Sequence, residues 1–252
     1  MTGFYDRRNK LVKIQFHTYY EGIEQEKRIA MEKKTALIVG STGLVGHELL
    51  HILLNCHEYQ TIYALVRRPL EVSHPHLIEV ICNFEELNEV EQYFTVDDVF
   101  CTLGTTIKKA KTKEAMYRID VEYPIAVAEL ARQHGAKHFL IVSSLQANKN
   151  ARIWYSKMKG ELEEQLKQIP YETLSIFQPA LLLGNRQEFR LFEKLGIHIV
   201  RTVGTIFGKR LRSSLGIEAK TVASAMYEVA QEGKKGIHVY TSRQMESIQE
   251  NL

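Results

Sequence analysis

The feature that most constrains the fold is a spaced set of glycines between a short apolar run and a helical pattern. The run at 35–40 is typical of a buried strand, and the pattern from about 44 to 54 is typical of a helix. The glycines between them follow GxxGxxG, not the commoner GxGxxG. This order predicts the first βα unit of a nucleotide-binding α/β domain, although a plain tight turn would also use glycines.

Each glycine of this turn has its own expected use. Gly40 would let the chain leave the strand sharply, Gly43 would let the backbone approach a pyrophosphate, and Gly46 would let the helix pack on the sheet. The free amides and the dipole at the start of the helix would then face the phosphates.

Strand-like and helix-like segments alternate along most of the remaining chain, which predicts a parallel sheet covered by helices on both faces. Right-handed crossovers make it a doubly wound α/β sheet. Beyond Gly184 the pattern weakens, and we expect residues 185–216 and the C-terminus to form a small substrate-side cap. Strands are expected at 61–66, 77–81, 98–102, 137–142, 172–177 and 237–240, and helices at 84–93, 113–134, 153–168 and 218–231.

Residues 1–30 differ from the rest of the chain. They lack a period of 2 or 3.6 and contain several aromatics of an exposed type. We therefore expect Met31 to be the natural start of a single domain at 31–252, with residues 1–30 either not native or weakly ordered. A genuine ordered extension is the alternative.

Charge and cysteine content narrow the functional classes. The net charge is +3, and residues 1–30 carry +2 of it, so the remaining 222 residues are close to neutral and give no support for nucleic-acid binding. No apolar run approaches the roughly 18–20 residues of a membrane span. The three cysteines stand far apart, which predicts neither a metal site nor a disulfide framework and fits a cytoplasmic location.

Two arginines follow the second expected strand, about 20 residues after the glycine turn. An NAD-binding domain usually places a carboxylate there for the ribose hydroxyls, and that group would repel a 2′-phosphate. Arg67 and Arg68 instead offer guanidinium groups that bind phosphate. The pair favours NADP(H) over NAD(H), although solvated loop arginines would look the same.

A YxxxK spacing joins Tyr155 and Lys159. The chain has 12 tyrosines, so this spacing also arises by chance, and its context carries the argument. On a helix the two side chains share a face, and the preceding strand ends at Ser143-Ser144, at the edge where doubly wound sheets bind ligands. A nearby ammonium lowers the pKa of a phenol, so Tyr155 would be a general acid/base, Lys159 its tuner, and Ser144, or secondly Ser143, would polarise the substrate oxygen.

Taken together, GSTGLVG, VRR, CTLGTT, the Ser-Ser strand end, YSKMKGELE and GNRQEFR resemble the atypical short-chain dehydrogenase/reductases, especially the Tat-interacting-protein-like NADPH-binding oxidoreductases. The resemblance covers about 34–190 well. It implies that the backbone at 42–45 binds the pyrophosphate, that Leu103-Gly104 borders the adenosine half, and that Arg186 lies near cofactor or substrate unless it forms a structural ion pair. The expected cofactor-binding residues are Gly40, Ser41, Thr42, Gly43, Leu44, Val45, Arg67, Arg68, Leu103, Gly104, Lys159 and Arg186, and the expected catalytic residues are Ser144, Tyr155 and Lys159.

One departure from the pattern concerns the middle helix. Many extended members carry Asn where this chain has Asp120, which leaves the usual proton-relay water unassigned. The short C-terminal region also lacks a known substrate motif.

Three functions remain open at this point. The first is an NADPH-dependent carbonyl reductase or alcohol dehydrogenase acting on a small molecule. The second is a redox-sensing or partner-binding regulator that holds the cofactor without turnover. The third, a sugar-nucleotide epimerase or dehydratase, is disfavoured by the small C-terminal region. The helices at 113–134 and 153–168 are candidates for a homodimer face or for covering the sheet.

Overall fold

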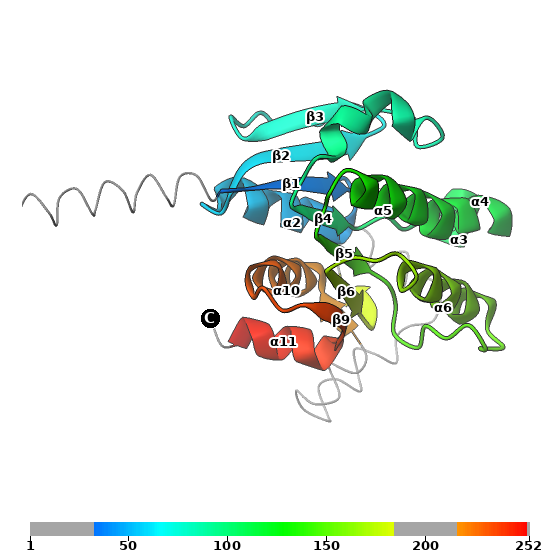
Figure 1. Ribbon diagram of the computed structural model, residues 1–252. Coiled ribbons are helices and arrows are strands. Elements are labelled where there is room, and N and C mark those ends of the chain that lie inside the picture. The colour runs from blue at the N-terminus through cyan, green and yellow to red at the C-terminus, as the bar shows by residue number, and fades with distance from the viewer. Residues whose placement is uncertain (1–32, 184–215, 251–252) are drawn as a thin grey trace, which may run out of the picture. The chain divides into compact units, whose positions relative to one another are not determined.

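A parallel sheet forms the centre of the computed structural model, which describes residues 33–183 and 216–250 (Figure 1). Within these residues the sheet has seven strands in the order β3-β2-β1-β4-β5-β6-β9. The order reverses between β1 and β4, the switch point at which doubly wound sheets bind ligands. The predicted fold class is confirmed. The strands are β1 (Lys34–Val39), β2 (Tyr59–Val66), β3 (Leu77–Ile81), β4 (Asp98–Cys101), β5 (His138–Val142), β6 (Thr173–Gln178) and β9 (Gly236–Thr241).

The central strands are short apolar runs because helices cover both of their faces. Successive residues of β1 point to opposite faces: Ile38 joins one core cluster, and Leu37 and Val39 join the other. The first cluster includes α2 (Leu44–Asn55) and α10 (Ala219–Gln231).

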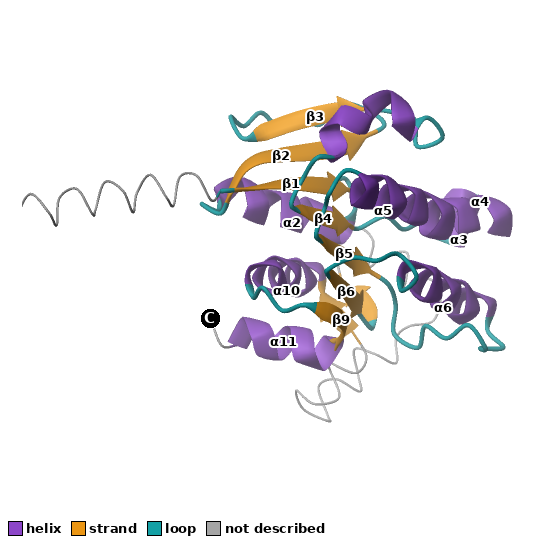
Figure 2. Cartoon of the chain, in the orientation of Figure 1, coloured by secondary structure: helices purple, strands orange, loops and turns teal. Residues whose placement is uncertain are grey.

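The second core cluster contains the buried faces of α5 (Tyr123–Gln133) and α6 (Trp154–Leu166). Figure 2 shows these helices on one side of the strands, and α2 and α10 on the other.

The helix predicted at 113–134 is confirmed as one continuous helical segment, although it contains a π turn that was not predicted. It contains α4 (Lys113–Tyr117), a π turn η2 (Arg118–Glu122) and α5. The amide of Tyr123 donates to the carbonyl of Arg118, five residues back. Pro124 follows and has no N–H, so it cannot restore the α-helical bond to residue 120. The wider turn contains Asp120, which is 1% exposed.

Other differences lie in short or polar elements. The segment expected as a helix at 84–93 is a 3-10 helix, η1 (Leu87–Phe94), kinked at Val90. Three features were not predicted: α3 (Ile107–Ala110), the parallel pair β7 (Leu181–Leu183) with β8 (Gly216–Glu218), and α11 (Ser242–Glu250). In α11 only Ser242 and Met245 are buried, so its apolar period is weak.

Two predictions fall outside the described residues, those for residues 1–30 and for most of the expected cap at 185–216. None of the helices in the described ranges is long and apolar enough to cross a bilayer.

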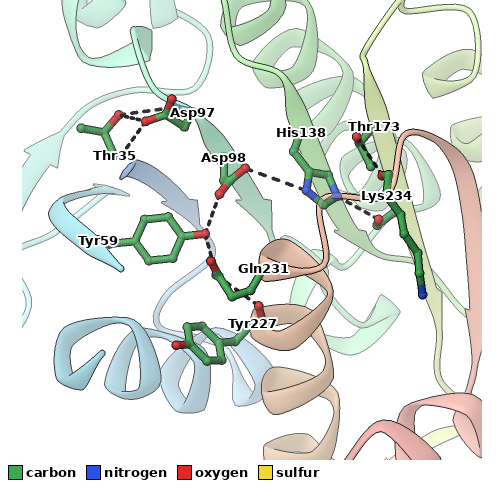
Figure 3. Close-up of polar contacts among 10 residues, drawn as sticks. Thr35, Tyr59, Asp97, Asp98, His138, Thr173, Tyr227, Gln231 and Lys234 are labelled. Atoms are coloured by element: carbon green, nitrogen blue, oxygen red, sulfur yellow. Dashed lines mark hydrogen bonds and ion pairs between the residues drawn. The ribbon is translucent and has the colours of Figure 1, made fainter. Parts of the chain in front are cut away.

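A buried polar network lies at the amino edge of the sheet (Figure 3). The phenol of Tyr59 donates to Asp98 Oδ2 at 2.6 Å and accepts from the Gln231 amide at 3.2 Å. His138 lies between Asp98 Oδ1, 3.8 Å from its Nδ1, and Ser175 Oγ, 2.9 Å from its Nε2. Asp98 and His138 are the first residues of β4 and β5. Because these side chains bond to one another, the strand starts carry polar groups that the core can tolerate.

Candidate active site at the carboxyl edge of the sheet

The glycine turn after β1 packs closely against the backbone that follows β4. Gly40 has a φ of +88°, and a Cβ there would lie 2.7 Å from the carbonyl carbon of Thr102. A Cβ on Gly46 would clash with the carbonyl oxygen of Gly40 and with Thr102 Oγ1. Only residues without a side chain fit these two positions, as the sequence predicted.

The start of α2 offers an anion a set of unused donors. The N-cap residue, Gly43, has no side chain that could cap the helix, and the first turn contains no acidic residue. Beside it Ser41 is 2% exposed, and its hydroxyl has no hydrogen-bond partner among the described residues. Buried hydroxyls are nearly always bonded, and a phosphate oxygen at a helix start would satisfy this one. The turn therefore fits a dinucleotide's pyrophosphate.

The two arginines stand where β2 ends, on the neighbouring strand of the same edge. Arg67 and Arg68 are both exposed, and neither forms an ion pair within the described ranges. Burial raises the pKa of the Tyr123 phenol, which also donates to Glu85, and the nearby charge of Arg67 opposes that rise. The guanidinium groups are thus available to a phosphate next to the turn.

The most strongly bound group of the site is the Lys159 ammonium. Its Nζ lies 2.9 Å from Oδ1 of Asp120, and the two side chains are 3% and 1% exposed. The other carboxylate oxygen of Asp120 accepts from the backbone amide of Thr105 at 2.8 Å. The carboxylate therefore links α6 to the loop that follows β4, and it uses one of the three donors of the ammonium.

The two serines after β5 are in different situations. Ser143 is buried and donates to Glu163 Oε1 at 2.5 Å, and the amide of Gln178 also donates to both oxygens of Glu163. Ser144 is half-buried, and its hydroxyl makes a 3.4 Å contact with the carbonyl of Leu145. The Ser143 hydroxyl is therefore occupied by its hydrogen bond to Glu163, whereas the Ser144 hydroxyl is available to a substrate.

Tyr155 and Lys159 lie one turn apart on α6 but differ in exposure. Tyr155 is 39% exposed, and its phenol makes no hydrogen bond with any described residue. The loop after Ser144 packs closely on this helix, because a Cβ on Gly160 would clash with the backbone of Asn148 and Lys149. The amide of Asn148 donates to the carbonyl of Ser156 at 2.9 Å. Gly160 thus fixes the serine loop against the helix that carries the tyrosine.

Three further predicted positions can be placed or set aside. Leu103 and Gly104 follow β4, and a Cβ on Gly104 would lie 3.6 Å from Asp120 Oδ1, which places them beside the buried ion pair. Arg186 lies outside the described residues.

Sequence reasoning gave no role to Asp120 or Glu163. A signal existed for the first, since Asp120 stands four residues after Met116 on the buried face of the segment. A carboxylate on such a face needs a partner, and the partner could have been sought among the lysines. The described residues contain no group of three or more metal-ligating side chains placed to hold an ion.

Comparison with known proteins defines the class. The sequence pattern of the NAD dependent epimerase/dehydratase family matches residues 36–245, so the chain belongs to that family. It is an NAD(P)-dependent enzyme of oxidoreductase type in the short-chain dehydrogenase/reductase superfamily. The resemblance drawn from the motifs is confirmed.

Two relatives illustrate the similarity. The chain is 35% identical to protein HTATIP2 of Rattus norvegicus over 164 residues, which are 64% of this chain and 67% of that protein. It is 37% identical to the mitochondrial protein FMP52 of Eremothecium gossypii over 153 residues, 60% and 68% of the two chains.

Solved structures share the fold at low identity. MoeE5, solved in complex with UDP-glucuronic acid and NAD, gives a TM-score of 0.63 at 16% identity, over 82% of this chain and 75% of that one. The oxidoreductase ylbE from Lactococcus lactis gives 0.59 at 19% identity, over 86% and 97%. Both support the fold described above.

Proposed function

We propose that this protein is an NADP(H)-dependent oxidoreductase that transfers hydride to or from a small carbonyl or alcohol substrate. The observation that carries the proposal is the buried hydroxyl of Ser41, which has no hydrogen-bond partner among the described residues and lies at the start of α2, where no side chain caps the helix. It stands on the same edge of the sheet as Ser144 and the helix that carries Tyr155 and Lys159. A phosphate-binding turn and a proton-transferring group at one edge are what hydride transfer needs.

The cofactor contacts follow from the groups left available. The amides of the turn and the Ser41 hydroxyl would hold the pyrophosphate, and Arg67 and Arg68 would hold the 2′-phosphate. Lys159 keeps two ammonium donors beyond its bond to Asp120 for ribose hydroxyls. When bound, the nicotinamide supplies or accepts the hydride.

The proton steps fall to side chains beside the cofactor. The Tyr155 phenol would donate a proton to the substrate oxygen in reduction and accept it in oxidation. The Ser144 hydroxyl would donate a hydrogen bond to the same oxygen and stabilise the charge that develops on it. Asp120 would hold the Lys159 ammonium in place, so that its position is set before the cofactor binds.

The alternative, a cofactor-holding redox sensor, has little chemical support in the cysteines. Burial raises the pKa of the Cys101 thiol to about 12. Burial also raises the pKa of Cys56 and of Cys82. Reactive sensor cysteines need a lowered pKa, so a thiol-based sensor is disfavoured here. The cytoplasmic location and the homodimer stay proposals, to be tested by fractionation and by light scattering.

The test compares two cofactors in one variant. Changing Arg67 and Arg68 to Ala should weaken NADPH about ten- to a hundredfold by calorimetry and leave NADH within about threefold, because only NADPH carries the extra phosphate. An equal loss of affinity for NADPH and NADH would show that the arginines do not bind the 2′-phosphate. A parallel screen of NADPH consumption over aldehydes, ketones and quinones separates an enzyme from a silent binder.

A further inference from the structure

Two segments that leave the carboxyl edge of the sheet contain several basic residues and no acidic residue of their own. Residues 102–113 follow β4 and contain four lysines, and residues 143–158 follow β5 and contain two lysines and an arginine. Neither segment holds a single Asp or Glu, whereas the whole chain has 33 basic and 30 acidic residues. Positive charge is therefore concentrated at one place on an almost neutral protein.

The two segments meet beside the proposed catalytic tyrosine. Lys113, the first residue of α4, has its Nζ 5.5 Å from the ring centroid of Trp154, the first residue of α6. Tyr155 is the next residue along that helix. The basic surface thus borders the site of proton transfer, whereas Arg67 and Arg68 follow β2.

Four of these seven basic side chains have no ion pair among the described residues. Lys149 binds Glu164 at 3.0 Å, and Lys157 lies 3.8 Å from Glu161. In contrast, the exposed side chains of Lys108, Lys111, Lys113 and Arg152 have no ion pair among the residues that the structure describes. An anion that binds here would meet these four cations, which are not paired with any carboxylate of the described residues.

The same surface also exposes large apolar side chains. Ile107, in α3, is 51% exposed, Ile153, just before α6, is 66% exposed, and Leu145, just after Ser144, is 40% exposed. Single exposed apolar residues are normal, but these three stand on the two basic segments. A ligand that fits this surface combines an apolar body with a negative charge.

We infer that the substrate carries an anionic group, a carboxylate or a phosphate, on an apolar body, and that Lys111, Lys113 and Arg152 bind the anion. The reactive carbonyl or alcohol would then lie at Tyr155. This inference rests on the proposed function and names the chemical class of its substrate. It also gives the lysines a role separate from the cofactor, whose phosphates have their own donors at β1 and β2.

The chain provides its own probe for this site, because Trp154 is its single tryptophan. Its fluorescence is titrated with benzyl alcohol, 4-(hydroxymethyl)benzoate, 4-(hydroxymethyl)phenyl phosphate and a cationic trimethylammonium analogue, with and without NADPH. NADPH with an alcohol gives no net reaction, so these titrations report binding alone. We expect both anions to bind at least about tenfold more tightly than benzyl alcohol at low salt, and the preference to shrink in 0.5 M NaCl (~4 Å Debye length).

Matched variants separate local charge from overall charge. Lys111→Gln with Lys113→Gln should reduce the anion preference about three- to tenfold, the range for two exposed charge contacts. The control is Lys137→Gln with Lys220→Gln, two exposed lysines on β5's amino side and α10, which removes the same charge and should leave the preference unchanged. The affinity for NADPH, measured by calorimetry, should not change in either variant.

Three results would overturn the inference. The first is equal binding of charged and neutral alcohols by the wild type, and the second is an equal loss of anion preference in the control variant. The third is a loss of NADPH affinity in the Lys111/Lys113 variant, which would assign the lysines to the cofactor. The relative strength of carboxylate and phosphate identifies the anion. If the proposed function is wrong, the protein will not bind NADPH. The titration without cofactor then still measures the anion preference.

Discussion

Polar side chains at the amino edge of the sheet bind one another, whereas several at the carboxyl edge have no partner among the described residues. At the amino edge, Tyr59, Asp98, His138, Ser175 and Gln231 bond to one another inside the protein (Figure 3). Each group lost its water on folding and gained a protein partner in return. The amino edge is therefore a self-contained scaffold.

The carboxyl edge keeps several groups without such partners. The buried Ser41 hydroxyl has none among the described residues, the Tyr155 phenol is exposed, and Arg67 and Arg68 form no ion pair in the described ranges. Other groups at this edge do have protein partners, since the Lys159 ammonium binds Asp120 and the Ser143 hydroxyl binds Glu163. This contrast indicates that candidate ligand-binding groups can be recognised as the polar groups that the fold leaves without a hydrogen-bond or ion-pair partner.

The sharpest test of this contrast is Tyr155→Phe. We expect turnover to fall about 10²- to 10⁴-fold, the usual contribution of a general acid/base, with unchanged NADPH affinity and unchanged unfolding by urea. Tyr93→Phe, on a half-buried tyrosine of η1, is the matched control and should keep full activity. Activity that survives Tyr155→Phe would remove the phenol from the mechanism.

Next in size is the buried ion pair. Asp120→Asn should lower the free energy of unfolding by about 3 kcal/mol, because it leaves the Lys159 ammonium buried beside a neutral amide. Urea denaturation measures the loss. Adding Lys159→Met should restore most of the stability, since both charges are then gone, but it should not restore NADPH affinity. If the double variant binds NADPH as the wild type does, Lys159 does not contact the cofactor.

A smaller effect is expected from Tyr59→Phe at the amino edge. The change leaves Asp98 and Gln231 each short of one bond and should lower the free energy of unfolding by about 1–3 kcal/mol at neutral pH, with NADPH affinity intact. Burial and, after it, the charge of Asp98 raise the pKa of the Tyr59 phenol. The folded state therefore keeps a proton that the unfolded state loses above about pH 10.

This linkage gives the same variant a pH signature. The contribution of Tyr59 is fully present below about pH 10 and is lost as the pH rises toward the higher pKa of the folded state. The stability of the wild type should fall with pH in this window, and Tyr59→Phe should reduce that slope by about 1.4 kcal/mol per pH unit. Equal slopes in the two proteins would mean that Tyr59 is not protonated more tightly in the folded state.

The smallest expected effect is at Ser41. Ser41→Ala should leave the stability of the cofactor-free protein unchanged or slightly higher, because a buried hydroxyl without a partner is removed. NADPH affinity should fall about three- to tenfold by calorimetry. Thr95→Ala, which removes an exposed hydroxyl directly after η1 and away from the glycine turn, is the control and should change neither quantity. A stability loss in Ser41→Ala would show that the hydroxyl has a structural role.

Local sequence patterns were enough to predict the architecture and the glycine turn after β1. Periods of 2 and 3.6 and the position of glycines are local signals, so the alternation of elements and the need for Gly40 and Gly46 could be predicted. The same signals predicted the helical segment around Pro124 but not its π turn, because the pattern of apolar residues does not show which carbonyl each amide will reach.

The division of the polar side chains between scaffold and site depends on contacts between elements that are distant in the sequence. Ser143 and Ser144 are identical in sequence, and it is Glu163, 20 residues after Ser143 on another element, that binds the first and leaves the second available. Asp120 and Lys159 are 39 residues apart and meet because η2 packs beside α6. Such pairings depend on distances between separate elements, and no periodicity along the chain encodes them.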